Sequence, residues 1–254
     1  MAGPKQRLGF WYRFVAGILR PVLMATTRRN WRGAEHLPGV GSGVVVAPNH
    51  ISYVDPLTFA HFLWDNGRAP RYLAKEAVFR IPVIGRIIAA CGQIPVYRDS
   101  KDAAQAFRDA VAAVEAGECV GIYPEGTISR DPALWPMAGK TGAARVALQT
   151  GCPVIPVAQW GPQEILAPHS KRVRLLPRKT MKVVAGPPVD LDALRGQPIN
   201  PVVLRQATDR ILDAITAQLA ELRGELPPAE RFDPSRVGLT RDSNPESAAP
   251  RDEA

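Results

Sequence analysis

A histidine and an aspartate five residues apart form the sharpest candidate for chemistry in this chain. His50 follows the apolar run GVVVA (43–47), which predicts a buried strand, and Asp55 precedes Pro56, which suits the first turn of a helix. A turn between these two elements can bring Asp55 against His50. A carboxylate on the Nδ1–H of an imidazole fixes its tautomer and leaves Nε2 as a general base. The alternative is that Asp55 only caps the helix and His50 is an ordinary polar residue.

The chain offers no convincing nucleophile beside this pair. It contains no G-x-S-x-G elbow, and Ser52 is too close to His50 in sequence to be an obvious partner. The three cysteines, Cys91, Cys119 and Cys152, lack a nearby sequence partner and indicate a reducing compartment. A His–Asp pair without a nucleophile suits a reaction in which the alcohol of the substrate attacks an activated thioester.

Two further motifs contain expected strands. GQIPVYR (92–98) places Arg98 at a strand end, where a guanidinium group can bind a phosphate. The alternative is an exposed arginine that pairs with Asp99 or Asp102. VIPVA (154–158) predicts a strand that either walls an acyl channel or belongs to the core.

The remaining motif, YPEGTISR (123–130), also follows an expected strand. Glu125 can orient a substrate hydroxyl or a neighbouring arginine, Gly126 lets backbone N–H groups approach a ligand, and Thr127 offers a hydroxyl. Pro-Glu-Gly alone is a common turn. This motif therefore indicates a function only in combination with the other three motifs.

The four motifs in this order, NHxxxxD, GQIPVYR, YPEGT and VIPVA, resemble the pattern of the glycerolipid acyltransferases. The resemblance covers residues 31–190 and is closest to the 1-acylglycerol-3-phosphate acyltransferases. It implies that His50 is the general base, that Asp55 orients it, and that Arg98 binds a phosphate.

In the same resemblance, the third motif completes the acceptor site through Glu125, Gly126 and Thr127. The family often has an arginine directly after the threonine, where this chain has Ile128. Either Arg130, two positions further on, takes the place of that arginine, or the acceptor pocket differs.

The resemblance implies an enzyme that moves a fatty acyl group to the sn-2 hydroxyl of lysophosphatidic acid, giving phosphatidic acid. The acyl donor is a thioester co-substrate, either acyl-CoA or acyl-carrier protein. We expect no cofactor and no metal, because the four histidines and three cysteines include no close ligand pair. Two alternatives stay open, which are another lysophospholipid or a glycolipid as acceptor, and a non-catalytic module that binds anionic lipid.

The beginning of the chain is basic. Residues 1–34 hold seven Lys or Arg residues and no acid, in a chain of net charge +8, so an anionic partner is expected. Apolar residues at three- and four-residue steps predict an amphipathic helix over 8–24 that stops or bends near Pro21. Arg13 and Arg20 interrupt the apolar run far short of the ~20 residues that a transmembrane helix needs. No signal-peptide pattern is present.

With aromatic residues beside its bases, this helix is expected to anchor the protein at an anionic membrane surface. The alternative is an ordinary helix packed on the domain. We expect a peripheral or monotopic protein at the cytoplasmic face of the membrane. Nucleic acid is not an expected partner, because the chain contains no RNP or helix-turn-helix motif.

Strand-like and helix-like segments alternate along the rest of the chain and predict an α/β fold. We expect a mixed, mostly parallel sheet covered by helices on both faces, preceded by the N-terminal amphipathic helix. The expected domains are a membrane-associating segment (1–30), the acyltransferase domain (31–224) and a disordered tail (225–254) with five prolines among charges. The last helix of the domain is predicted over 201–223.

Overall fold

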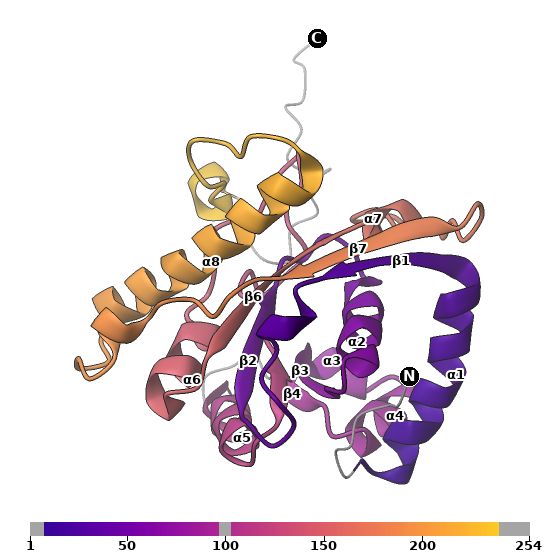
Figure 1. The fold of residues 1–254 in the computed structure, drawn as a ribbon, viewed down its shortest axis with the longest axis horizontal. Helices are drawn as coiled ribbons and strands as arrows, with labels where there is room; N and C mark the ends of the chain where they lie inside the picture. Colours follow the sequence, from indigo (N-terminus) through magenta and orange to yellow (C-terminus); the bar gives the residue numbers. More distant parts are fainter. Residues whose placement is uncertain (1–7, 97–102, 239–254) are drawn as a thin grey trace.

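The computed structural model describes residues 8–96 and 103–238, which contain a seven-stranded sheet flanked by helices (Figure 1). The order of the strands across the sheet is β1-β7-β6-β2-β5-β3-β4. The strands are β1 (Thr27–Arg32), β2 (Val44–Pro48), β3 (Pro70–Lys75), β4 (Ile94–Val96), β5 (Cys119–Gly121), β6 (Val154–Trp160) and β7 (Lys179–Ala185). All neighbours pair in parallel except β6 and β7, so β1 and β7 run opposite to the other five strands. The expected mixed, mostly parallel sheet is confirmed.

Helices cover both faces of the sheet, as expected (Figure 1). The α-helices are α1 (Phe10–Thr26), α2 (Asp55–Asp65), α3 (Glu76–Phe79), α4 (Ile84–Ala90), α5 (Ala103–Glu115), α6 (Gly142–Thr150), α7 (Pro162–Ile165) and α8 (Pro201–Arg223). Short 3-10 helices are η1 (Ala34–His36), η2 (Asp192–Leu194) and η3 (Pro234–Val237). The expected last helix matches α8, which Asn200 caps by accepting the N–H groups of Val202 and Val203.

The core lies on both sides of β2, the central strand. Val45 and Ala47 pack with buried residues of α5, α6 and α8, whereas Val44 and Val46 pack with residues of α2. All five residues of β2 are buried because successive side chains point to opposite faces and both faces are covered. This packing fixes the carboxyl end of β2, from which the candidate site begins.

The sequence analysis did not predict β1. Its sequence TRRNWR is polar, but β1 lies at the edge of the sheet, pairs in parallel with β7 and leaves most of its side chains exposed. Polar and basic side chains are typical of edge strands. The expected boundary between residues 30 and 31 therefore falls inside a strand of the domain.

Helix α1 continues through Pro21 to Thr26, so of the two expectations, a stop or a bend near Pro21, the stop is wrong. Pro21 provides no N–H for the Gly17 carbonyl four residues earlier, but both residues are exposed, so water can satisfy that carbonyl. Two contacts fasten α1 to α2, since the Tyr12 ring stacks on Trp64 and Arg20 pairs with Asp65 at 2.7 Å. No residue of α1 is buried, so the helix lies on the surface of the domain.

The segment after α8 differs from the expected tail over residues 225–238, which contact the domain. Phe232 accepts the N–H of Ala138 at 2.8 Å, and Arg231 pairs with Asp209 and Asp213 of α8. These contacts correct the expectation for this part, because prolines and charges in the sequence did not indicate a docking site. The rest of the expected tail, 239–254, lies outside the described residues.

Candidate active site

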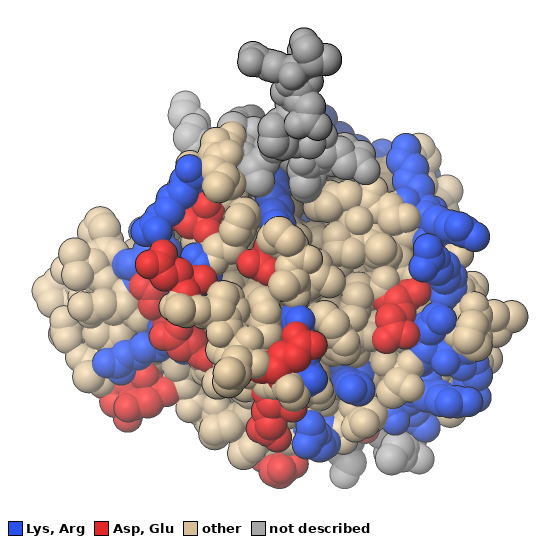
Figure 2. Space-filling view, turned by 90° about the horizontal axis from the view of Figure 1, so that it is seen from above, with Lys and Arg blue, Asp and Glu red and all other residues tan. Residues whose placement is uncertain are grey.

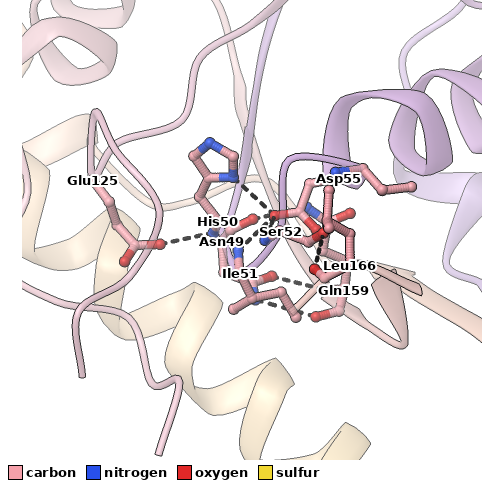
Figure 3. A network of polar contacts seen from close by, with 9 residues as sticks. Asn49, His50, Ile51, Ser52, Asp55, Glu125, Gln159 and Leu166 are labelled. Carbon is pink, nitrogen blue, oxygen red and sulfur yellow. Dashed lines mark hydrogen bonds and ion pairs between the residues drawn. The ribbon is translucent and has the colours of Figure 1, made fainter. Parts of the chain in front are cut away.

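The loop between β2 and α2 brings His50 and Asp55 together. Nδ1 of His50 lies 2.8 Å from Oδ2 of Asp55, which also accepts the N–H of Ile51 at 2.5 Å and that of Ser52 at 2.8 Å (Figure 3). The Asp55 side chain is fully buried, and 16% of the His50 side chain is exposed. Asp55 binds the loop that precedes α2, and Val54 is the N-cap residue. The geometry therefore matches the expected pairing and not the capping alternative.

Burial and hydrogen bonding act on Asp55 in opposite directions. Burial raises the pKa of its carboxyl, whereas His50 and the N–H groups of Ser52 and Ile51 lower it. In the neutral form of the imidazole, donation of the Nδ1 proton in a hydrogen bond to the carboxylate leaves Nε2 with a lone pair. Figure 3 shows this second ring nitrogen on the side of the ring away from Asp55. His50 can therefore accept a proton from a group on that side.

Glu125 binds the same loop from β5's carboxyl side. Its Oε1 accepts the N–H of His50 at 2.8 Å (Figure 3). Its Oε2 accepts the N–H of Met137 at 3.1 Å. Burial, at 2% exposure, raises the pKa of Glu125 to about 8 against the lowering effect of these two hydrogen bonds. Both carboxyl oxygens are thus engaged by the main chain, which the sequence analysis did not anticipate.

The loop that carries the rest of the third motif is bound to the loop that carries His50. Ser129 donates its N–H to the His50 carbonyl at 2.7 Å, which joins the two loops. Gly126, at φ 70°, is exposed, and Thr127 is half-buried. Ile128, which stands where the family often has an arginine, is buried at 3% exposure, and Arg130 is 8% exposed. Arg98 lies outside the described residues.

Sequence reasoning missed several residues that hold the site. Asn49 and Gln159 exchange three hydrogen bonds of 2.8–3.1 Å between the ends of β2 and β6. The Tyr123 ring lies against the His50 ring, with 4.3 Å between centroids. Ser52 Oγ donates to the Leu166 carbonyl at 2.7 Å. One signal in the sequence could have indicated such residues, namely a polar residue at the end of an expected buried strand, such as Gln159.

The fourth motif is core. Val154, Ile155 and Val157 of β6 are fully buried and contact residues on the two faces of the sheet. Of the two readings of VIPVA, the packing matches the core. This strand contributes to the site through Gln159 at its carboxyl end.

The three cysteines lie at the amino ends of the parallel strands, which is the side of the sheet opposite to His50. Cys91 precedes β4, Cys119 begins β5 and Cys152 precedes β6, so all three lie at amino ends of parallel strands. Burial raises the pKa of the Cys119 thiol to about 11. A hollow of about 410 Å³, lined by Arg71 and Glu118 among others, also lies at this edge. None of these groups belongs to the His50 site. Within the described part of the chain, His, Cys, Asp and Glu form no cluster of three that could hold a metal ion.

The fold and the site are those of a known protein family. Residues 28–160, more than half of the chain, match the model of the Acyltransferase family, and the chain belongs to this family. The matched region contains His50, Asp55 and Glu125. The family resemblance of the four motifs is confirmed.

Curated relatives give the more particular likeness. The chain is 32% identical over 143 residues to a chloroplastic 1-acyl-sn-glycerol-3-phosphate acyltransferase of Brassica napus (56% of this chain, 40% of that protein). It is 35% identical over 132 residues to the enzyme of the same name from Borreliella burgdorferi (50% of this chain, 49% of that protein). The chain thus covers less than half of each of these relatives.

A solved structure has the same fold. The crystal structure of the 1-acyl-sn-glycerophosphate acyltransferase from Thermotoga maritima superposes with a TM-score of 0.64 at 21% identity. The superposition covers 85% of this chain and 83% of the other. The likeness extends beyond the residues that the family model matches.

Proposed function

We propose that this chain transfers a fatty acyl group from a thioester to the sn-2 hydroxyl of 1-acylglycerol 3-phosphate, giving phosphatidic acid. The observation that carries the proposal is the contact between His50 Nδ1 and Asp55 Oδ2, at the carboxyl edge of the sheet of an acyltransferase-family chain. The names of the relatives from Brassica napus and Borreliella burgdorferi support this acceptor.

His50 acts as the general base. Its Nε2 takes the proton of the sn-2 hydroxyl while the hydroxyl oxygen attacks the carbonyl carbon of the thioester. A C–O bond forms, the C–S bond breaks, and the sulfur leaves with the electron pair as a thiolate, which then takes the proton from His50. Asp55 stabilises the imidazolium in between. A thiolate leaves readily because thiols are much more acidic than alcohols.

The acceptor phosphate is assigned to Arg98, Arg130 and the turn at Gly126 and Thr127. Gly126 is exposed and Thr127, which carries a hydroxyl, is half-buried, and both support a polar rim beside His50. Glu125 is assigned a positioning role, because its two oxygens hold the N–H groups of His50 and Met137. In this role, Glu125 fixes the position of the general base, His50.

A different lysophospholipid or a glycolipid is the second candidate acceptor. Ile128, buried at 3% exposure, stands where the family often has an arginine, which favours a different acceptor pocket. The donor is proposed to be acyl-CoA or acyl-carrier protein. A non-catalytic module that binds anionic lipid is the alternative function outside the enzymes.

The membrane partner is proposed from helix α1. Its apolar residues Phe10, Phe14, Ile18 and Val22 recur every four residues and are 47–71% exposed, so they form one outward stripe. In the described ranges, no helix has the length and apolar content to span a bilayer. A peripheral or monotopic contact with an anionic membrane is the corresponding proposal, and the three free cysteines support its cytoplasmic face.

One assay tests these assignments together. Purified protein is mixed with labelled acyl-CoA or acyl-carrier protein and a panel of lysophospholipid and glycolipid acceptors. Phosphatidic acid should form fastest, and His50→Ala should abolish thioester consumption while liposome binding persists. Equal turnover by His50→Ala would overturn the mechanism, and a faster product from another acceptor would overturn the substrate.

A further inference from the structure

The segment between α7 and β7, residues 166–178, projects from the domain with little cover from the rest of the protein. We call it the basic arm. Its residues 171–178 are all exposed, including three apolar side chains, Val173, Leu175 and Leu176, at 57%, 46% and 78% exposure. Exposed apolar residues gathered in one short segment mark an interaction site more often than scattered ones do.

The basic arm has an uncompensated positive charge. The sequence holds no acid between Glu164 and Asp190, while six bases fall in this stretch. Four of them, Lys171, Arg172, Arg174 and Arg178, are in the arm, and Lys179 and Lys182 follow in β7. None of the six forms an ion pair with a carboxylate in the part of the chain that is described. By contrast, Arg20 and Arg29 near α1 both pair with Asp65. The arm therefore offers its charge to an outside anion.

The two ends of the basic arm are tied to functional elements. At its start, the Leu166 carbonyl accepts the hydroxyl of Ser52, in the loop that joins His50 to Asp55. At its end, Arg178 donates to the carbonyls of Met24 (2.7 Å) and Thr27 (2.6 Å), where α1 meets β1. The arm thus connects the candidate catalytic loop with the end of α1.

The pictures agree with this placement. In Figure 1 the long turn before β7 lies at the same end of the molecule as α1. In Figure 2, turned about the horizontal axis, Lys and Arg side chains gather at that end, on the right. The basic arm and α1 therefore lie at the same end of the molecule, where Lys and Arg side chains gather.

We propose that the basic arm is a second contact with an anionic membrane, which acts beside α1. This inference rests on the membrane association of the proposed function and adds the surface that orients the protein. Bases contact anionic headgroups, and Val173 and Leu176 enter the boundary of the acyl chains. A lipid surface supplies both a negative and an apolar layer, which the alternation KRVRLL requires. When α1 and the basic arm both contact the membrane, the His50 loop is held beside the lipids among which an acceptor lysolipid resides.

The test compares matched variants of the full chain for binding to vesicles of phosphatidylcholine, with or without phosphatidylglycerol. One variant carries Lys171→Gln with Arg172→Gln, and its control carries Arg108→Gln with Arg210→Gln on α5 and α8. A second carries Val173→Ser with Leu176→Ser, and its control carries Val202→Ser with Leu226→Ser, which are 64% and 93% exposed. Thermal unfolding of each variant establishes that it is folded.

The charge variant should lose about fivefold in affinity for each base on phosphatidylglycerol vesicles at low salt. The loss should vanish on pure phosphatidylcholine, whereas the apolar variant should lose affinity for both vesicles. Both controls should bind like the wild type. Equal binding by the arm variants and their controls would overturn the inference.

An activity measurement separates this inference from the proposed function. With a short-chain lysophosphatidate dissolved in water, the arm variants should keep the wild-type kcat/KM, and with acceptor in vesicles they should lose activity in step with binding. If the wild type acylates no acceptor, the proposed function fails while the vesicle result still decides the role of the arm. A loss of kcat/KM confined to acyl-carrier protein, with intact vesicle binding, would reassign the arm to an acidic donor protein.

Discussion

The main-chain N–H of His50 donates to Oε1 of Glu125 across 2.8 Å, so the candidate base is held by its backbone as well as by its ring. Asp55 fixes the imidazole, and Glu125 fixes the loop that carries it. Because Glu125 is 2% exposed, water is not available to replace either of its hydrogen bonds. Changes at these two carboxyls should therefore have different signatures.

Asp55→Asn should lower kcat by about 10³- to 10⁴-fold with the fold intact, by analogy with the Ser–His–Asp triad. The amide cannot hold the proton of His50 on Nδ1, so Nε2 loses its role as base. The measurement is steady-state kinetics together with near-ultraviolet circular dichroism. Asp65→Asn is the matched control, since Asp65 is 4% exposed on the same helix but binds Arg20 and Arg29. A similar kcat loss in both variants would contradict the role of Asp55.

Glu125→Gln should lower kcat about tenfold to a hundredfold and change the acceptor KM less than about threefold. One of its two acceptor oxygens becomes an NH₂ group that faces a backbone N–H, which shifts His50 without touching the substrate. Glu164→Gln, an exposed change on α7, is the control. A raised KM with unchanged kcat would instead place Glu125 in direct contact with the acceptor.

Glu125→Gln should also change how the free energy of unfolding depends on pH. Burial raises the pKa of Glu125 from 4.5 to about 8, so folding favours its neutral form. That contribution is fully present below pH 4.5 and is lost as the pH rises through about 8. The free energy of unfolding of the wild type, measured in urea, should therefore fall relative to Glu125→Gln between these values. A constant difference would mean that the raised pKa is absent.

Acyl transfer should be direct, with sequential kinetics and no acyl-enzyme. Ser52 Oγ already donates to the Leu166 carbonyl and accepts the Val54 N–H, and Cys119 is fully buried at the opposite edge of the sheet. Mass spectrometry after mixing with labelled donor alone should find unmodified protein. Ping-pong kinetics or a trapped acyl group would point to one of these two residues as a nucleophile.

Arg98→Ala should raise the acceptor KM by about 10- to 150-fold, the equivalent of ~1.5–3 kcal/mol for one charge-assisted phosphate contact. The turnover number should change little, because Arg98 is assigned to the phosphate and not to the reacting hydroxyl or the thioester. Initial rates over a range of lysophosphatidic acid concentrations measure both constants. An unchanged KM with a collapsed kcat would remove Arg98 from phosphate binding.

Phe14→Ser with Ile18→Ser should weaken binding to anionic vesicles at least tenfold, because each side chain contributes ~1.5–3 kcal/mol when it leaves water. Flotation of the folded variant with vesicles is the measurement, and Val202→Ser is the control. These substitutions are a cleaner test than deletion of residues 1–29, which would remove part of β1. Unchanged flotation would leave α1 as an ordinary packed helix.

Much of the fold follows from patterns between near neighbours in the chain. The apolar run GVVVA predicted β2, and all five residues of that strand, Val44–Pro48, are buried because both faces of the sheet are covered. Asp55 next to Pro56 predicted the start of α2, and that local turn is what brings the carboxylate to His50. The family resemblance was carried by the same short motifs. Each of these features depends on interactions within a few residues.

Only the tertiary structure decided the contacts that cross the chain. Glu125 meets the backbone of His50 from 75 residues away, and Gln159 meets Asn49 from 110 residues away. β1 is a strand because its backbone pairs with β7, although its polar side chains gave no strand pattern. The positions of such groups are set by the packing of the sheet, which depends on the free energy of the whole core. The sequence determined the chemistry available at the site, and the packing of β2, β5 and β6 decided which groups hold it in place.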